Sequence, residues 1–319
     1  DRPLIPRCSA FKFDDVSAAE PTEFELYYRA GEHEYRYALS VHADEIVSEG
    51  LWRRKLGASR TAMLFEREDT KVELGPTLRK LVTAARFNPS LPYLSFLCIN
   101  FDAPVVQEAA SWFLDAVFLN YNSSYLERML EQMLDEGDSR EVTRFLRAVD
   151  VRIDGFRVER APEWRGRRVF VRHEVGGKAY ELRLSEESAG AQKLMGLAAY
   201  LMAALECGGT VVVDELDAKL HPKLLRYVIL LFKDPEVNKS GAQLIFSSQD
   251  VSTMRNDVFR RDEIWFAARG EGEASQLWSL ADIHEANGNL VSKNAAFDKQ
   301  YLSGRYGADP YLTRIEEWD

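Results

Sequence analysis

The sequence is poor in cysteine, with Cys8, Cys98 and Cys207 as the only three in 319 residues. They are far apart and none belongs to a CxxC pair, which indicates neither a zinc site nor a disulfide framework and fits a reducing cytoplasm. Long apolar runs are missing too. The most apolar window, residues 194–205, is too short to cross a bilayer and predicts a buried helix. Because no basic segment followed by an apolar one opens the sequence, no signal peptide is expected.

The chain also has no excess of basic residues. It carries 41 Lys and Arg against 51 Asp and Glu, a formal charge of -10. This excludes a protein that coats nucleic acid with its whole surface but permits a local basic patch. Residues 152–172 are a candidate patch, because their arginines alternate with aromatic residues that could follow a nucleic-acid strand. The competing interpretation, favoured by the charge usual on edge strands, is a solvated hairpin whose arginines pair with Asp154, Glu159 and Glu163.

With 46% hydrophobic and 29% charged residues, the chain is an ordinary globular protein that can bury a substantial core. Short alternating segments over residues 10–66 predict antiparallel strands. Between 76 and 150 the apolar spacing becomes helical. The helical segments expected there cover residues 77–87, 104–121, 124–137 and 139–150.

After Gly155 the pattern returns to strands and then alternates. "TVVVD" and "QLIFSS" are nearly continuous apolar runs, which are typical of strands buried on both faces of a sheet covered by helices. The second half of the chain is therefore expected to be α/β. In order, we expect a hairpin over 167–185 with its turn at "GGK", a helix over 189–206 ended by Gly208 and Gly209, a strand over 210–214, a helix over 222–233, a strand over 243–248, a helix over 251–259 and strands over 263–268 and 276–280.

Two acids, Asp214 and Glu215, end the strand "TVVVD". A buried charge is expensive, and ligands of α/β sheets collect at the carboxyl ends of strands, so a cation or a polar ligand is expected there. An aspartate in this place can hold Mg²⁺, and an adjacent glutamate can orient water against a γ-phosphate. The polar residues 247–250, "SSQD", end the next strand and could sense that phosphate. The alternative is an acid pair that caps the following helix.

A helix start favours the ligand interpretation. Ser188 and Gly190 open the long helix that precedes the acidic strand, and free amides beside a hydroxyl make a site suited to phosphate. Serine is also a common helix cap, so the residues alone do not indicate a phosphate site. Their position before "TVVVDELDAKLHP" is what favours one. His221 precedes Pro222 with no second His or Cys at metal spacing, which predicts a helix-start role.

Taken together, seven stretches give the chain a resemblance to a known family. It resembles the ABC-type ATPase heads of SMC, DNA-repair and overcoming-lysogenization-defect proteins, and more closely the bacterial AAA-type ATPases of phage-defence and abortive-infection loci. The stretches, spread over nearly the whole chain, are "FKFDD", "TEFELYY", "ESAGAQKL", "TVVVDELDAKLHP", "QLIFSSQD", "RRDEIWF" and "YLSGRYGADPYL".

The resemblance implies an α/β fold, an ABC-type P-loop ATPase head whose mixed sheet has flanking helices, with an antiparallel β-lobe and a helical insert. Residues 1–75 would form the antiparallel β part, 76–150 the helical insert, and 151–319 the part with the signature helix, Walker B and switch.

The resemblance also implies roles for single residues. Asp214 matches the Walker B aspartate that holds Mg²⁺, and Glu215 matches the catalytic glutamate. Gln249 stands where the family usually has a switch histidine. The residues that would bind nucleotide across a dimer are Ser188, Gly190 and Ala191 of the signature motif and Asp217 of the D-loop.

Two departures from the family matter for activity. Gln249 can hydrogen-bond a phosphate but cannot carry a positive charge, so hydrolysis could be slow. No GxxxxGK[ST] occurs in the sequence. In the family this loop precedes the strands matching "FKFDD", so we expect an N-terminal segment that holds it, outside the sequence; a natural protein without it is the alternative.

The expected function is that of a cytoplasmic ATPase without a membrane segment, using ATP and Mg²⁺. The resemblance implies a homodimer or higher oligomer joined through an ATP sandwich, which controls an effector in anti-phage defence. The effector, a nuclease or toxin, would contact the lobe at 76–150. The alternative function is a nucleotide-gated scaffold that hydrolyses little or no ATP and holds such a partner inactive.

Overall fold

The computed structural model describes residues 10–43, 45–83, 85–120, 130, 133–134, 139–149, 151–160, 167–285 and 288–308. The chain divides into two compact units, Asp1–Asp115 and Ala116–Asp319, which are described one at a time. Together their sheets and helices make a mixed α/β protein, as expected. Among the described residues, no helix combines the length and the apolar character needed to span a membrane.

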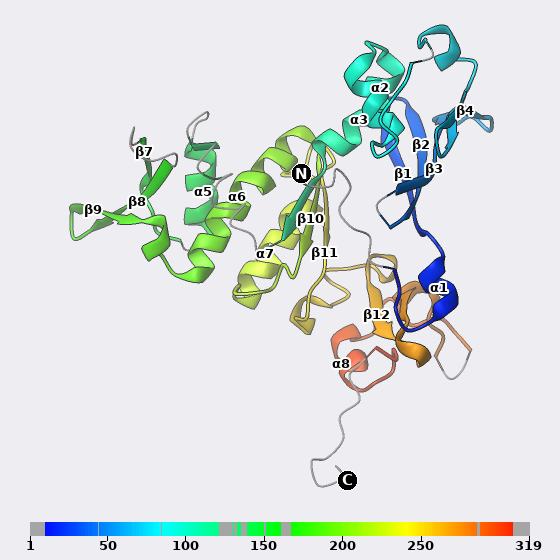
Figure 1. Ribbon diagram of the computed structural model, residues 1–319. Coiled ribbons are helices and arrows are strands. Elements are labelled where there is room, and N and C mark those ends of the chain that lie inside the picture. Colours follow the sequence, from blue (N-terminus) through cyan, green and yellow to red (C-terminus); the bar gives the residue numbers. More distant parts are fainter. Residues whose placement is uncertain are drawn as a thin grey trace. The chain divides into compact units, whose positions relative to one another are not determined.

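The first unit is built on a five-stranded antiparallel sheet (Figure 1). The alternating segments of residues 10–66 are strands, as predicted, and the strand order follows the sequence, β1-β2-β3-β4-β5. Its elements are α1 (Asp15–Ala19), β1 (Thr22–Ala30), β2 (His33–His42), β3 (Glu45–Lys55), β4 (Thr61–Glu68), β5 (Lys71–Leu74), the 3-10 helix η1 (Leu78–Lys80), α2 (Tyr93–Asn100) and α3 (Pro104–Asp115).

Helices α2 and α3 supply apolar side chains to the core of this unit. The Tyr28 hydroxyl on β1 donates to the carbonyl of Ala109 on α3 at 2.6 Å, which joins helix and sheet at the centre of that core. The core gathers alternate residues of the strands with one side of each helix, among them Tyr28, Tyr35, Leu51, Phe65, Leu78, Leu97, Val106 and Ala109.

Two predictions for this unit are wrong. The helix expected over residues 77–87 is only the short η1, because Leu78 and Val82 are buried in the core while Leu81 is half exposed. In so short a segment, the packing of Leu78 and Val82 decides the conformation, and the helical spacing of the apolar residues does not. The "FKFDD" stretch, matched to strands by the resemblance, contains no strand. Its Asp14 instead caps α1, accepting from the amide of Ser17 at 2.9 Å.

The second unit contains two small antiparallel sheets and one parallel sheet. Its described elements are β6 (Val117–Asn120), α5 (Arg140–Ala148), β7 (Gly155–Arg160), β8 (Arg167–Val175), β9 (Lys178–Arg183), η2 (Leu184–Glu186), α6 (Ala189–Cys207), β10 (Thr210–Asp214), α7 (Pro222–Lys233), β11 (Gln243–Phe246), η3 (Val251–Thr253), η4 (Arg261–Glu263), β12 (Trp265–Arg269), η5 (Glu271–Glu273), β13 (Ser275–Ser279), η6 (Leu280–Asp282) and α8 (Phe297–Leu302).

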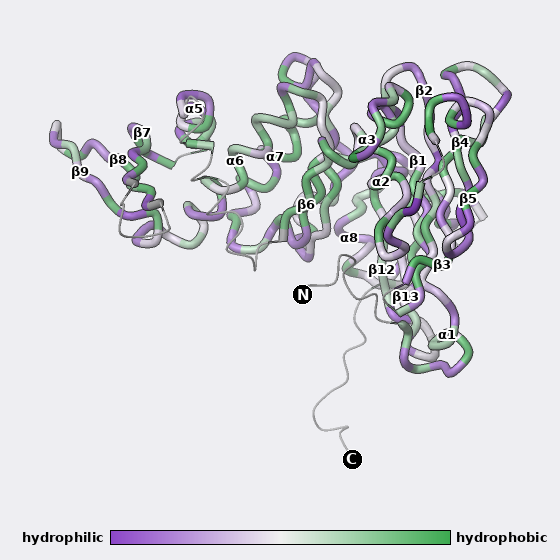
Figure 2. Tube along the Cα trace, turned by 45° about the horizontal axis from the view of Figure 1, so that its top comes forward, coloured by the Kyte–Doolittle hydropathy of each residue, from purple (hydrophilic) through white to green (hydrophobic). Residues whose placement is uncertain are grey.

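The parallel sheet carries the acidic strand at its centre, in the order β11-β10-β6. Helices α5, α6 and α7 join the core that lies against it, and Figure 2 shows hydrophobic colouring along α6, α7 and β6. The predicted helix 222–233 and strand 210–214 have the expected bounds, and Gly208 ends α6 with a left-handed φ of 78°. The expected hairpin forms between β8 and β9.

Within the described part of the second unit, one face of this sheet carries exposed apolar side chains, contrary to the prediction that its strands are buried on both faces. Phe118, Val212 and Ile245 are aligned in register, and Phe118 and Ile245 are 65% and 54% exposed. The strand order explains this. The chain moves from β6 to β10 to β11 in one direction across the sheet, so right-handed crossovers place both connecting helices on the same face.

Two helical predictions in this unit are also wrong. The segment 104–121 is not one helix, because α3 ends at Asp115 and residues 117–120 pair with β10 as β6. The segment 251–259 forms only η3 and a turn closed on the Arg255 carbonyl, since Val258 and Phe259 are drawn into the core. The expected helix 124–137 lies mostly outside the described residues, as do residues 309–312 of the last matched stretch.

Candidate functional site

The acidic strand β10 leads into a strained loop, which we call the acidic loop, residues 214–219. Glu215 and Lys219 both have left-handed backbones, with φ of 54° and 62°. Neither is glycine, so each costs on the order of 1–2 kcal/mol relative to a relaxed conformation. Strain of this kind persists only where neighbouring groups hold the backbone in place.

Ser247, at the end of β11, is one of these groups. Its hydroxyl donates to Asp214 Oδ1 at 2.6 Å and accepts from the Glu215 amide at 2.8 Å. Its carbonyl accepts from the amide of Leu216 at 3.0 Å. The ends of two neighbouring parallel strands are thus tied together, as expected from their shared edge.

Asp217 lies deeper in the same loop. Its Oδ2 accepts from the backbone amide of Gln249 at 3.2 Å, while its Oδ1 is buried and has no hydrogen-bond partner within the described part of the chain. Asp214, Glu215 and Gln249 are exposed. The loop therefore presents the carboxylates of Asp214 and Glu215 outward, and Asp217 adds a buried acceptor with unused capacity. The exposed side-chain amide belongs to Gln249, which follows the neighbouring strand.

The start of α6 reaches this loop. Ser188 is the N-cap, and its hydroxyl accepts from the Ala191 amide at 3.2 Å. The amides of Ala189 and Gly190 have no acceptor among the described residues, so the first turn keeps free donors. A Cβ at Gly190 would come within 2.9 Å of the Lys219 carbonyl, so glycine permits the helix start to lie against the acidic loop.

Lys193, one turn further along α6, is buried, with 5% of its surface exposed. Its ammonium donates to the carbonyls of Glu215 at 3.1 Å and Leu216 at 3.2 Å, and also to that of Ala218. Burial lowers the pKa of Lys193 to about 8, an effect opposed by the carboxylates of Asp217 and Glu215.

Sequence reasoning missed Lys193 and Ser247 as individual site residues. Both had a signal. A lysine within the apolar run of a long helix is unusual, because lysine is almost never fully buried unless it is paired. A serine directly after a strand that neighbours the acidic strand must come close to the acids, because parallel strands end at the same edge.

The remaining candidates agree with the interpretation that the sequence favoured for each. His221 caps α7, accepting from the Lys223 amide at 3.2 Å, with Pro222 as the first helical residue. In the Arg-rich segment 152–172, Arg157 lies 3.7 Å from the expected partner Glu159. Arg157 and Arg172 also both bind Glu181 of β9, which was not among the acids expected. These ion pairs indicate a charged hairpin. Residues 161–166 of the segment lie outside the described part of the chain.

The described residues include no cluster of three His, Cys, Asp or Glu side chains that could hold a metal. Mg²⁺ does not require one, because it usually binds one or two carboxylates and completes its shell with water and phosphate oxygens. The exposed carboxylate of Asp214 and the Ser247 hydroxyl beside it are oxygen donors of the type that Mg²⁺ prefers. These residues fit such an ion.

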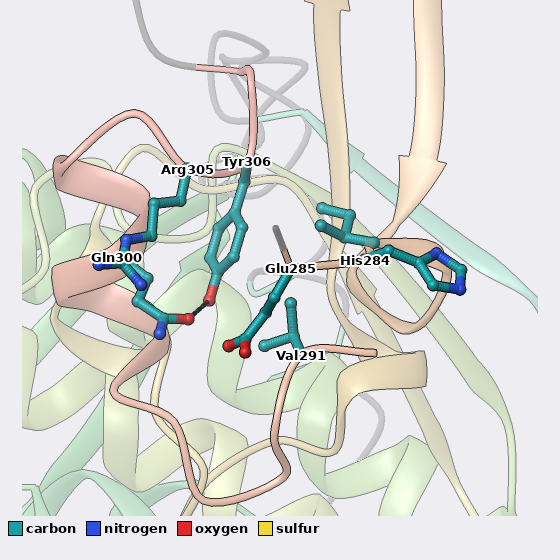
Figure 3. A pocket seen from close by; sticks show the side chains of 7 residues that line it. His284, Glu285, Val291, Gln300, Arg305 and Tyr306 are labelled. Atoms are coloured by element: carbon teal, nitrogen blue, oxygen red, sulfur yellow. Dashed lines mark hydrogen bonds between the residues drawn. The ribbon is translucent and has the colours of Figure 1, made fainter. Parts of the chain in front are cut away.

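A hollow in the C-terminal part of the second unit is separate from the acidic loop. Figure 3 shows its side chains, with the Tyr306 hydroxyl donating to Gln300 Oε1 at 2.6 Å. None of the lining residues comes from the loop or from the start of α6. They are Ile283, His284, Glu285, Val291, Gln300, Arg305 and Tyr306.

Comparison with known proteins adds a family match. Residues 9–255 match the family model described as "AAA domain, putative AbiEii toxin, Type IV TA system". No curated protein matches the chain. The matched span includes the acidic loop, the start of α6, Ser247 and Gln249.

Among the solved structures that are similar to this chain, three are each 13% identical to it. The SMC head domain from Thermotoga maritima has a TM-score of 0.33, covering 78% of this chain and 74% of that chain. The SMC head with an extended coiled coil bound to the C-terminal domain of ScpA, derived from Pyrococcus furiosus, has a TM-score of 0.37, covering 78% and 77%. RecF with ATP has a TM-score of 0.24, covering 70% and 76%. Likenesses of this size carry no functional argument.

Proposed function

The chain belongs to the AAA family matched over residues 9–255, and from that premise we propose that it is an ABC-type ATPase head that binds and hydrolyses ATP with Mg²⁺. The observation that carries the proposal is the pairing of two outward-facing acids with Ser247 at the joined ends of β10 and β11. The free amides at the start of α6 support it, because a helix start favours phosphate.

The roles follow from what each side chain presents. Asp214 would hold Mg²⁺, with the Ser247 hydroxyl fixing the orientation of its carboxylate. The bound ion would neutralise charge on the phosphate oxygens. Glu215 would accept a hydrogen bond from the attacking water and orient it. Gln249 would donate from its side-chain amide to the γ-phosphate, without the positive charge of a histidine.

The second half of the site would act across a dimer. Ser188, Gly190 and Ala191 would bind the γ-phosphate of nucleotide held by a second copy, and Asp217 would lie at the interface between the copies. The Ala191 amide is already bonded to Ser188 Oγ, so the free donors for that phosphate are the amides of Ala189 and Gly190. Closing and opening of the dimer would follow ATP binding and hydrolysis.

We further propose that this cycle controls an associated effector, a nuclease or toxin, in anti-phage defence within the cytoplasm. The family description names a toxin of a toxin–antitoxin system, which supports a role beside a toxic activity. The effector would contact the segment 76–150. For the Arg-rich segment 152–172, the pairing of Arg157 and Arg172 with Glu181 favours a charged hairpin over a nucleic-acid strip.

The test is steady-state ATP turnover of the full-length natural protein beside its Glu215→Gln variant. We expect turnover to fall by about 100-fold or more in the variant while ATP binding persists, because the amide cannot orient the water as a carboxylate does. Asp234→Asn, an exposed acid at the end of α7, serves as the matched control and should keep full turnover.

Equal and low turnover in both proteins would overturn the enzymatic proposal. It would favour the alternative, a scaffold that binds nucleotide, hydrolyses little and holds its effector inactive. The neutral, exposed Gln249 is the observation on which that alternative rests.

A further inference from the structure

The acidic loop is held from two sides. From the sheet, Ser247 binds Asp214 and the backbone of Glu215 and Leu216. From the helix, the Lys193 ammonium donates to three carbonyls of the loop, those of Glu215, Leu216 and Ala218. The three carbonyls point at one cation, so their positions relative to one another are restrained.

The burial of Lys193 is costly and calls for a physical reason. A buried ammonium loses its hydration, whereas a methionine of similar length in the same place would have no such cost. A charged donor compensates by making hydrogen bonds that are stronger than those of neutral donors. The bonds go to a loop with two left-handed non-glycine residues, Glu215 and Lys219, which needs restraint from outside to keep its conformation.

The same helix carries the other half of the proposed site. Ser188 and Gly190 lie one turn before Lys193, and the Gly190 Cα lies against the Lys219 carbonyl at the far end of the loop. Two contacts, one through Gly190 and one through Lys193, therefore join the start of α6 to the acidic loop.

We propose that Lys193 is a positioning residue that locks the acidic loop to the start of α6, so that Glu215 and the Ser188–Gly190 turn form one rigid body within the subunit. In the proposed dimer, Glu215 would act on one nucleotide and Ser188 with Gly190 on the other. Lys193 thereby couples the two sites through a single subunit. The coupling rests on the proposed function, whereas the lock itself does not.

The lock is tested first by hydrogen exchange of the wild-type protein without nucleotide. The amides of Leu216 and Ala218 are bonded to Ser247 and Glu215 carbonyls. We expect them to exchange as slowly as the amides of β10, because the loop opens only with the sheet. Exchange that is about 100-fold faster than in β10 would overturn the proposal.

Lys193→Met then removes the ammonium while keeping an apolar side chain of similar length. We expect loop amides to exchange at least about tenfold faster, the equivalent of one lost hydrogen bond to a charged group, while β10 and α7 keep their protection. Lys239→Met, an exposed lysine of the same unit, is the matched control and should leave the loop unchanged. Unaltered loop exchange in folded Lys193→Met would contradict the lock. If that variant does not fold, the wild-type measurement decides.

Turnover separates positioning from general stability. In Lys193→Met we expect kcat to fall by about tenfold or more with little change in ATP affinity, and Lys193→Arg, which keeps the cation, to recover part of the loss. A loss of affinity with unchanged kcat would contradict the coupling. If the wild-type protein does not hydrolyse ATP, the proposed function fails, and the exchange experiment still reports on the lock.

Discussion

Each unit of the molecule contains a buried cationic side chain, and the two differ in the groups that accept their hydrogen bonds. In the first unit, Arg67 lies fully buried against the equally buried carboxylate of Glu49, with Nη1 to Oε2 at 3.3 Å. In the second unit, Lys193 binds backbone carbonyls, and the nearby acids Asp214 and Glu215 face outward. In the first unit the buried cation pairs with a buried carboxylate. In the second unit the carboxylates of Asp214 and Glu215 remain exposed to solvent.

Both oxygens of Glu49 are fully engaged by donors. Its two oxygens accept from the Tyr37 hydroxyl at 2.9 Å, from the amides of Tyr93 and Leu94, and from Arg67. Arg67 also donates to carbonyls of the segment before α2, which fastens that segment to β3 and β4. Burial still raises the pKa of Glu49, against the opposing effect of these donors. Such a network stabilises a fold and leaves nothing with which to bind a ligand.

The acidic loop shows the reverse arrangement. Two of its residues have left-handed backbones, and the carboxylates of Asp214 and Glu215 are exposed. Asp217 Oδ1 is buried without a partner among the described residues. Strain and unused hydrogen-bonding capacity are features that persist where a site must accept something from outside. The comparison teaches that a buried charge by itself does not indicate a binding site. Polar groups that keep unused hydrogen-bonding capacity are the better indication.

The largest effect is expected from breaking the closed network. Arg67→Met leaves Glu49 buried without its cation and should lower the free energy of unfolding by about 3–5 kcal/mol. Chemical denaturation followed by circular dichroism measures the change. Arg29→Met, which removes an exposed partner of Glu34, should cost no more than about 1 kcal/mol. Equal costs for the two variants would show that the buried pair is not special.

A smaller effect on stability, but a clear one on activity, is expected at the open site. Ser247→Ala removes the hydroxyl that joins Asp214 to the Glu215 amide and should reduce ATP turnover by about 10–100-fold, as is usual when a group that orients a metal ligand is lost. Its free energy of unfolding should change by about 1 kcal/mol, because one hydrogen-bonding group is lost. Ser252→Ala, an exposed serine five residues on, is the control. Unchanged turnover would remove Ser247 from the site.

The smallest effect concerns the strain itself. Lys219→Gly relieves the left-handed backbone but adds flexibility to the unfolded chain, so stability should rise by up to about 1 kcal/mol. Gly241→Ala, the inverse change at a glycine with φ of 75° and no atom within 4 Å of the new Cβ, should lose about 1 kcal/mol. Thermal unfolding of both variants provides the measurement. A destabilised Lys219→Gly would mean that the conformation of residue 219 is not strained.

Much of the fold of the second unit could be predicted because its strands and helices are long enough for their period to be read. The bounds of β10 and α7 match their predictions, and Gly208 ends α6 as a left-handed cap. The wrongly predicted helices fall on short segments, residues 77–87 of the first unit and 117–120 and 251–259 of the second, in which a few apolar residues satisfy either period. There, burial against neighbouring elements decides the conformation, and those neighbours are distant in sequence.

The candidate site also has a part that could be predicted from the sequence and a part that could not. The acids after β10 and the serine and glycine at the start of α6 were identifiable from residue type and position, and their catalytic and binding roles remain predictions. The contact of Gly190 with the Lys219 carbonyl and the direction of the Lys193 ammonium could not be read from spacing. Each depends on how α6 lies beside a loop more than twenty residues away.

The sequence by itself determined which candidate polar residues stand at strand and helix ends, because residue type and position relative to a strand or helix end are local properties. Only the tertiary structure decided which of them meet. Strand order placed Ser247 beside Asp214 and left Phe118 and Ile245 exposed on one face of the sheet. Packing of α6 turned Lys193 toward the loop. Strand order and helix packing are set by burial summed over the whole unit, which no local stretch of sequence contains.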